Sequence, residues 1–490
     1  MNNASSKLIN SASLLIAGKF FQRSVGLISI VILARVLTPQ DFAIAAIISM
    51  VIYFFDVLSD LGNEQYIIQK KEVSDKDLDA AWTINILIKS CLTLLLVLCI
   101  PFINSFYSEM QLTGALLVAT CVLPIRALRN SGILRFQREL VYKQLFFLTI
   151  FQRLGSFCAV MLMIWIYPSF WALIIGDITS ALIFTFGSYI VHTFRPSFSL
   201  KNIKQQWLFS RWILAKNIIG YTRSQIDTFI VSSLFNARDL GRYYLSRDIV
   251  MLPSQNLLTP AIQPLLATFS AKHHSGNSLG RQLEFSLLVT TMLTIPIVFY
   301  IWYFPAPLID TILGEQWSDS YILLSRLSLL VLYIPFIVLF EQIMIAKGWV
   351  AKLLVFDIAS LILICSGLLV LGDTVLSEFA MHRGLLGIGA TCVLILFIRV
   401  QMNFSLFAWG IWCLICAAVS YLSVLGVQYI NRVSDSSGVV ILLISGGVFT
   451  SLYAAAMALI VRMLAPRNEN CLFLKRLMTK YIAQIREKLG

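Results

Sequence analysis

The chain has 490 residues, of which 58% are hydrophobic and 13% are charged, and its mean hydropathy is +0.81. Soluble domains carry about 25% charged residues and under about 50% apolar ones. A chain as apolar as this one would expose aggregation-prone patches in water. This composition excludes a water-soluble protein and predicts an all-α, polytopic membrane protein.

Apolar runs bounded by charged or turn residues predict about 14 transmembrane helices, because each run approaches the roughly 20 residues that span a bilayer. The fourth run is short, since Pro124 interrupts it, and its end could extend toward Leu128. The twelfth and thirteenth runs are nearly fused at Gln401–Asn403, so the number could change by one or two. The predicted spans are 13–34, 42–61, 81–103, 112–125, 144–166, 169–191, 212–235, 241–268, 283–304, 321–346, 353–372, 384–402, 404–428 and 438–461.

Positive charge sets the orientation of these helices, because lysine and arginine are retained on the cytoplasmic side of a membrane. If the N-terminus is inside, 25 of the 38 lysines and arginines fall in inner segments and 5 in outer ones. This asymmetry predicts that both termini are cytoplasmic. The net charge of +13 then reflects topology, and no nucleic-acid partner is expected.

Several enzyme classes are disfavoured by what the chain lacks. The predicted outer loops are short, whereas a membrane-bound polysaccharide polymerase or ligase needs a catalytic surface outside. The phosphate-binding pattern G-x-x-x-x-G-K-[ST] is absent from the sequence, so no ATP site of that kind is expected. Cys413 and Cys416 form the only close cysteine pair and have no charged or histidine neighbour, so no metal site is expected. We therefore expect a transporter without catalytic residues.

An internal repeat relates the first and the seventh predicted helices at an offset of 198 residues. Ala17–Lys19 begins a helix that ends at Leu37–Phe42, and Ala215–Asn217 begins one that ends at Phe235–Leu240. Parallel repeats in transporters place a substrate site between the two halves near the membrane midplane. The expected organisation is a six-helix bundle (1–193), a cytoplasmic linker (194–210), a second six-helix bundle (211–402), two additional helices (403–461) and a basic tail (462–490).

Several short motifs recur through the first two thirds of the chain. They are Ile32–Phe42, Ser59–Gly62, Tyr66–Glu72, Ile226–Asp227, Asp239–Tyr244 and Leu313–Trp317. These motifs resemble those of Wzx-type polysaccharide flippases, in particular the branch that includes colanic acid exporters. The likeness covers about residues 10 to 350, and Asn63–Gln65 departs from it where small or apolar residues are usual. The identity of the cargo is therefore not carried over.

This resemblance implies the multidrug/oligosaccharidyl-lipid/polysaccharide exporter superfamily, with two six-helix bundles in a V and two extra C-terminal helices. The implied task is to move an undecaprenyl-diphosphate-linked oligosaccharide across the bacterial inner membrane by alternating access, for O-antigen, capsule or exopolysaccharide synthesis. Implied partners are membrane lipids and a polysaccharide polymerase or chain-length regulator. No cofactor is expected apart from a coupling proton or sodium ion. An ion-coupled exporter of drugs or of another lipid-linked precursor is the alternative.

Cations inside the predicted spans are the strongest functional signal, because each costs at least about 2.5 kcal/mol at a helix centre. Arginine's planar fork suits phosphate oxygens, so a diphosphate is the matching ligand. Tyr221, beside Arg223, is a candidate for stacking on a sugar ring. The eight cations are Lys19, Arg23, Lys89, Arg153, Lys216, Arg223, Arg247 and Arg326. Those expected to face a central cavity are Arg23, Arg223, Lys216, Arg153, Lys19 and Arg247.

Structural roles for these charges compete with the functional ones. Arg223 could pair with Asp227 four residues later, Arg247 with Asp248, and Lys19 could reach the inner membrane surface. Asp227 is the candidate for ion coupling or for a gating salt bridge. The tail after Val461 alternates apolar and basic residues at helical spacing, which is typical of a helix on an anionic leaflet or of a docking site for a partner.

Overall fold

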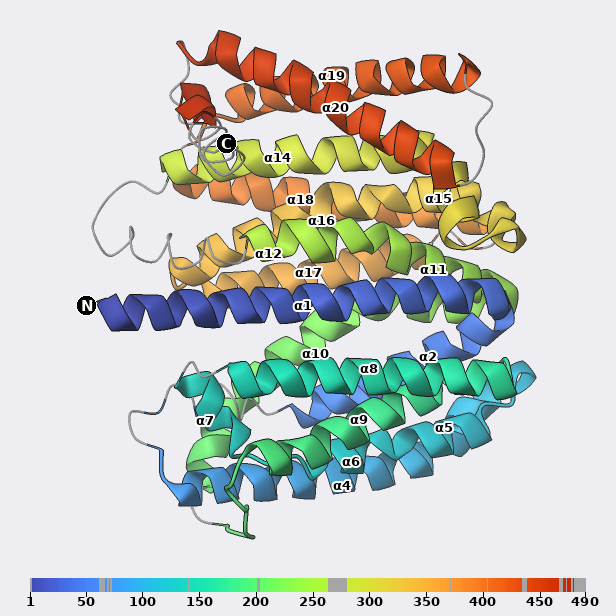
Figure 1. The fold of residues 1–490 in the computed structure, drawn as a ribbon, viewed down its shortest axis with the longest axis vertical. Helices are drawn as coiled ribbons and strands as arrows, with labels where there is room; N and C mark the ends of the chain where they lie inside the picture. Colours follow the sequence, from blue (N-terminus) through green and yellow to red (C-terminus); the bar gives the residue numbers. More distant parts are fainter. Residues whose placement is uncertain are drawn as a thin grey trace, which may run out of the picture. The chain divides into compact units, whose positions relative to one another are not determined.

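A computed structural model of the protein contains only helices as regular structure within its described residues (Figure 1). Its contacts divide the chain into two compact units, Met1–Leu245 and Ser246–Gly490. The predicted all-α fold is confirmed. The described residues are 2–60, 67, 70, 73–139, 142–200, 203–262, 280–370, 372, 374–402, 404–433, 439–466, 470–472, 474–476 and 479.

The first unit contains the helices from α1 to the start of α11. Helices α8 and α9 form a hairpin with α1 packed along α8, while α2 packs on both α4 and α10 (Figure 1). The bounds are α1 (Asn2–Val36), α2 (Pro39–Ser59), α4 (Asp75–Phe106), α5 (Thr113–Thr120), α6 (Val122–Ala127), α7 (Ile133–Arg138), α8 (Lys143–Ile166), α9 (Trp171–Val191), α10 (Ile203–Leu234) and α11 (Ala237–Pro253), with a 3-10 turn at Ser108–Met110.

Small residues allow α8 and α9 to approach closely, as is common where helices associate in membranes. A Cβ added at Gly176 of α9 would lie 2.4 Å from Val160 of α8, and one at Gly155 would lie 2.2 Å from Ile183. The hydroxyl of Ser156 also donates a hydrogen bond to the carbonyl oxygen of Gly176 at 2.9 Å. This hairpin is therefore held by backbone proximity as well as by apolar contact.

The two copies of the internal repeat begin their second helices in the same way. Thr38 caps α2 through a reciprocal capping box with Asp41, the third helical residue. Asn236 lies 198 positions after Thr38, at the equivalent point of the second copy. Its side chain accepts a hydrogen bond from the backbone N–H of Asp239 at 2.9 Å and donates one to the carboxylate of Asp239. Both turns satisfy otherwise unpaired N–H groups with short polar side chains. The repeated sequence thus encodes a repeated helix start.

The second unit packs α16 against both α14 and α18, and continues through α14 to α19 and α20. Leu339, Phe340 and Ile343 of α16 are fully buried in its apolar core. Pro253 precedes a π-helical turn at Ser254–Leu258, since proline disturbs the regular helical hydrogen bonds. The bounds are α12 (Thr259–Ile262), α14 (Gly280–Tyr303), α15 (Pro305–Ile312), α16 (Tyr321–Ala346), α17 (Val350–Leu369), α18 (Leu376–Met402), α19 (Leu406–Val433) and α20 (Val439–Leu464), with a 3-10 turn at Glu315–Ser320.

The motif Leu313–Trp317 forms a tight turn in the second unit. Gly314 has a φ of +99°, a backbone conformation that residues other than glycine rarely adopt. Trp317, three residues later, is completely buried. The backbone N–H of Trp317 donates to the carbonyl oxygen of Gly314 at 3.1 Å. Glycine and tryptophan in this motif therefore have a structural reason to be present.

Eleven described helices are long and apolar enough to cross a membrane, which confirms a multi-pass membrane protein. The other three predicted spans also coincide with helices, although each departs from a plain apolar helix. The span 112–125 is broken at Cys121, because Pro124 cannot donate to the carbonyl of Thr120. The spans 212–235 and 241–268 correspond to α10 and to α11 with its π-helical extension, both rich in charged residues. Helices α18 and α19 are separate.

The predicted division into bundles stays a prediction. Helix α10 begins at Ile203, within the stretch 194–210 expected as a linker, and it packs on α2 of the first unit. Some predicted features fall outside the described residues: the motif positions 61–66, 68–69 and 71–72, the end of the eighth span at 263–268, and most of the basic tail beyond 466.

Candidate functional site

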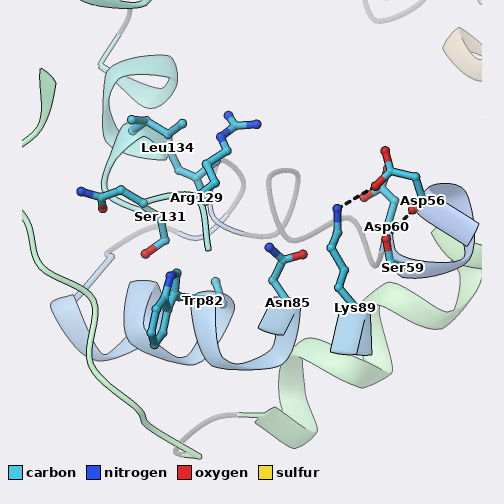
Figure 2. Close-up of a pocket in the computed structure, with 12 residues that line it drawn as sticks. Asp56, Ser59, Asp60, Trp82, Asn85, Lys89, Arg129, Ser131 and Leu134 are labelled. Carbon is cyan, nitrogen blue, oxygen red and sulfur yellow. Dashed lines mark hydrogen bonds and ion pairs between the residues drawn. The ribbon is translucent and has the colours of Figure 1, made fainter. Parts of the chain in front are cut away.

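One face of α4 lines a pocket in the first unit (Figure 2). Trp82, Asn85 and Lys89 follow one another at intervals of three and four residues, so a helix places them on the same side. They face the end of α2 and the segment 129–134 that follows α6. The cavity measures about 270 Å³, slightly below the ~300–1,000 Å³ common for small-molecule sites.

Asp56 of α2 joins two further helices at the edge of this pocket. Its Oδ1 lies 2.7 Å from Lys89 Nζ in α4, and its Oδ2 lies 2.8 Å from Arg126 Nη1 in α6. The Lys89 side chain is only 11% exposed. Because a charge buried alone is far more costly than a paired one, the three residues are expected to stabilise one another. The ion pair between Lys89 and Asp56 is drawn in Figure 2.

A second carboxylate extends this arrangement into the α8–α9 hairpin. Asp177 of α9 interacts electrostatically with both Arg126 and Arg153. Arg153 lies in α8, and a Cβ added at Gly26 of α1 would lie 2.6 Å from its Nη2. Lys89, Asp56, Arg126, Asp177 and Arg153 thus alternate in sign across α4, α2, α6, α9 and α8. We call these five residues the charge chain.

The pocket lining combines hydrogen-bond donors and acceptors without an excess of charge. Asp56 and Asp60 balance Lys89 and Arg129. Asn130 is fully buried and satisfied, since its amide donates to the carbonyl oxygen of Phe194 and its Oδ1 accepts from Gly132 N. The remaining lining residues are Ser59, Ala81, Trp82, Asn85, Ser131, Ile133 and Leu134.

Two lining residues have features suited to binding a ligand. Ser131 is one of the residues that line the cavity, and its hydroxyl oxygen is enclosed by the protein without a hydrogen-bond partner among the described residues. Trp82 is partly exposed, and its ring meets that of Phe198 edge-on, with centroids 5.9 Å apart. The structure therefore offers an aromatic surface and a hydroxyl group at one cavity.

The structure distributes the predicted cavity cations over several sites. Arg153 belongs to the charge chain, whereas Lys19 and Arg23 on α1 are exposed and partly exposed, respectively. Lys216 and Arg223 on α10 are partly buried and interact with other residues. The charge of Arg247 acts on the neighbouring Asp248, and whether Arg247 is a structural partner of Asp248 or a cavity cation stays a prediction. An arrangement of all six around one cavity stays a prediction.

Asp227 is fully buried where α10 meets α11. Its Oδ2 accepts a hydrogen bond from the Tyr243 hydroxyl at 2.9 Å, and its Oδ1 accepts one from Thr228 N at 3.0 Å. Sequence reasoning identified Asp227 but not Tyr243, because the partner lies on the following helix. The role of Asp227 in coupling or gating, and its pairing with Arg223, stay predictions.

Tyr221 contributes to the packing of α10 on α2. Its hydroxyl donates to the carbonyl oxygen of Met50 at 2.6 Å, and its ring lies near those of Tyr53 and Phe54. The candidate for sugar stacking thus has a structural role in this unit.

Arg126 was expected among the cytoplasmic loop charges, but it lies in α6 and pairs with Asp56. The signal that could have located it is the apolar run that continues past Pro124 to Leu128. Lys89 was recognised only as one of eight cations in predicted spans. Its pairing with Asp56 depends on the packing of α4 on α2, which no local sequence pattern specifies.

Relatives are found by both sequence and fold. The chain is 24% identical over 62% of its length to the succinoglycan biosynthesis transport protein ExoT of Rhizobium meliloti, covering 62% of that protein. It is 23% identical over 60% of its length to the lipopolysaccharide biosynthesis protein WzxC of Escherichia coli, covering 61% of it. The alignments thus span about three fifths of these relatives. The name of ExoT, a transport protein, agrees with the expectation of a transporter and not an enzyme.

The fold is similar to that of the lipid II flippase MurJ in an inward closed conformation. The TM-score is 0.75, with 14% sequence identity, over 92% of this chain and 99% of that one. Residues 32–322, more than half of the chain, match the family described as polysaccharide biosynthesis protein. The resemblance found in the sequence motifs is confirmed, and the chain belongs to the polysaccharide biosynthesis protein family.

Proposed function

We propose that this protein is a flippase that moves a lipid-linked oligosaccharide repeat unit from the inner to the outer leaflet of a bacterial inner membrane. The observation that carries the proposal is the family membership, joined to a multi-pass helical fold similar to that of a lipid II flippase. Undecaprenyl diphosphate is the proposed lipid carrier. The product serves the synthesis of a surface polysaccharide.

The chemistry of such a cargo supports the proposal. Its lipid tail can stay in the bilayer, whereas its diphosphate and sugars need a polar route through the hydrocarbon. The charge chain and the neutral polar pocket supply polar groups within the first unit. A cation-coupled drug exporter would instead favour a net acidic site, which the balanced lining of this pocket does not provide.

Binding of the diphosphate is assigned to the cavity cations. Arg23 and Arg223 are the proposed principal ligands, because guanidinium groups bind phosphate oxygens bidentately. Lys216, Arg153, Lys19 and Arg247 complete the proposed set. Alternating access would then carry the bound headgroup across, with Asp227 acting in ion coupling or gating. The driving force is a proton or sodium gradient, or consumption of the cargo outside.

The test is transport by purified protein in vesicles that contain diphosphate-linked saccharide in the outer leaflet. We expect saccharide to become protected from an impermeant glycosidase or lectin only in vesicles that contain the protein. Proton and sodium gradients are then imposed separately to identify the coupling ion. Failure to move the cargo under any gradient, with a protein shown to be folded, would refute the proposal. Reporter fusions at both termini test their proposed cytoplasmic location.

A further inference from the structure

The pocket on α4 has a composition that distinguishes between classes of ligand. Its lining holds two carboxylates and two cations, and the Lys89 cation is engaged by Asp56, which also pairs with Arg126 outside the lining. A phosphate site needs cations that are free to neutralise the ligand, and a lipid tail needs a mostly apolar lining. Neither requirement is met here, whereas a neutral ligand rich in hydroxyl groups can use donors and acceptors together.

We infer that this pocket binds one uncharged sugar unit of the cargo, an inference that rests on the proposed flippase function. Trp82 supplies an apolar ring face for the C–H groups of a pyranose, and Phe198 supports that ring. Ser131 lines the pocket and is only 8% exposed, and its enclosed hydroxyl makes no hydrogen bond within the described part of the chain. Leaving such a group buried and unpaired is costly, and a sugar hydroxyl would remove that cost.

The surrounding residues restrict how a sugar can bind. Asn85 donates its amide to the carbonyl oxygen of Ala127 at 3.1 Å, which fixes the side chain and leaves its Oδ1 as an acceptor. Figure 2 shows Asn85 extending from α4 toward the segment that carries Arg129 and Ser131, whereas Lys89 extends toward Asp56. The cavity of about 270 Å³ is small, so it suits a single sugar and not a complete repeat unit.

The position of the pocket matches the side from which cargo is collected. It lies between the C-terminal end of α2 and the N-terminal half of α4, the ends that the predicted topology places toward the cytoplasm. A sugar bound there would enter the protein before translocation, and the pocket would contribute to selection between repeat units.

Saturation-transfer NMR on the full-length protein in nanodiscs tests this inference with free, lipid-free sugars. The panel contains neutral hexoses, N-acetylhexosamines, deoxyhexoses and their disaccharides, with inorganic pyrophosphate as the anionic probe. We expect at least one neutral sugar to receive saturation and pyrophosphate not to displace it. Trp82→Ala should lower the affinity for that sugar at least about tenfold, and Ser131→Ala should lower it about three- to tenfold. Trp82→Phe should retain part of the binding.

Trp165→Phe is the matched control, because Trp165 is 84% exposed on α8 and is not among the pocket residues. It should bind sugar like the unmodified protein. Absence of transfer to every sugar, displacement by pyrophosphate, or unchanged binding in Trp82→Ala would each overturn the inference. Such a result would leave the flippase proposal intact. A protein that binds sugar at Trp82 but moves no lipid-linked saccharide would instead refute the proposed function alone.

Discussion

The Tyr243 hydroxyl donates a hydrogen bond to Asp227 Oδ2 at 2.9 Å, and both side chains are fully buried. This contact joins α10 to α11 directly after the repeated helix start at Asn236. A buried carboxylate within a membrane protein marks a functional position by default. Its hydrogen-bond donor is therefore as important to test as the carboxylate.

Asp227→Asn is expected to slow vesicle transport at least about tenfold while the protein still inserts at normal levels, if Asp227 couples or gates transport. Tyr243→Phe should give a smaller loss, because it removes one donor but keeps the carboxylate. Asp239→Asn is the control, since Asp239 caps the start of α11 and pairs with Arg242. Unchanged transport in Asp227→Asn would exclude Asp227 as a coupling residue.

Replacing the two principal arginines should separate phosphate binding from structural pairing. Arg23→Ala and Arg223→Ala are each expected to reduce surface polysaccharide export about 10- to 100-fold at normal membrane abundance. Lysine at either position should keep part of the activity as a point charge. Full export by Arg223→Ala/Asp227→Asn would show that Arg223 serves only to neutralise Asp227.

Asp56→Asn should destabilise the first unit, because it leaves Lys89 and Arg126 without their shared carboxylate. The expected loss is about 1–3 kcal/mol, below the ~3–5 kcal/mol of a fully buried pair, because Asp56 and Arg126 are only partly buried. It should appear as a lower thermal unfolding temperature in detergent. Asp75→Asn is the comparison, since its partner Arg135 forms a more exposed pair that should contribute no more than about 1 kcal/mol. Equal effects of both substitutions would contradict the structural role of the charge chain.

Gly241→Ala should separate the starts of α2 and α11. A Cβ at Gly241 would lie 1.7 Å from the carbonyl oxygen of Pro39, so backbone would have to move. We expect a loss of about 1–3 kcal/mol in stability and reduced transport.

Gly220→Ala in α10 is the matched control, because nothing lies within 4 Å of its added Cβ. Alanine there should be neutral or stabilising by up to about 1 kcal/mol. Similar results at both glycines would argue against close packing at Gly241.

Protonation of His192, which follows the end of α9, should make the stability of the folded protein depend on pH. Burial and the positive charges of Arg135 and Arg195 lower its pKa from 6.5, against an opposing effect of Glu139. The unfolded chain therefore takes up a proton at a higher pH than the folded protein does. Stability should be complete above about pH 6.5 and should decline as the pH falls toward the lowered pKa. Thermal unfolding between pH 7.5 and 5 should show a smaller decline for His192→Gln; an identical profile would contradict this account.

The sequence alone determined the membrane class and the positions of the helices, because bilayer crossing requires long apolar runs and these are local features. It also identified the internal repeat at an offset of 198 residues, and the structure then showed that Thr38 and Asn236, at equivalent positions of the repeat, begin helices with capping partners only three residues away. The family likewise followed from short motifs, and in one of them Gly314 proved to adopt a positive φ in a turn that buries Trp317.

Only the tertiary structure decided which charges meet. Asp56 lies 33 positions from Lys89 and 70 positions from Arg126 along the chain. Their pairing therefore depends on how α2, α4 and α6 pack. The same holds for the pocket, where Trp82 and Ser131 come together from separate segments. Periodicity reports which face of a helix is apolar, but it does not specify the neighbour that this face will contact. Ion pairs and binding sites between distant helices are therefore decided by packing.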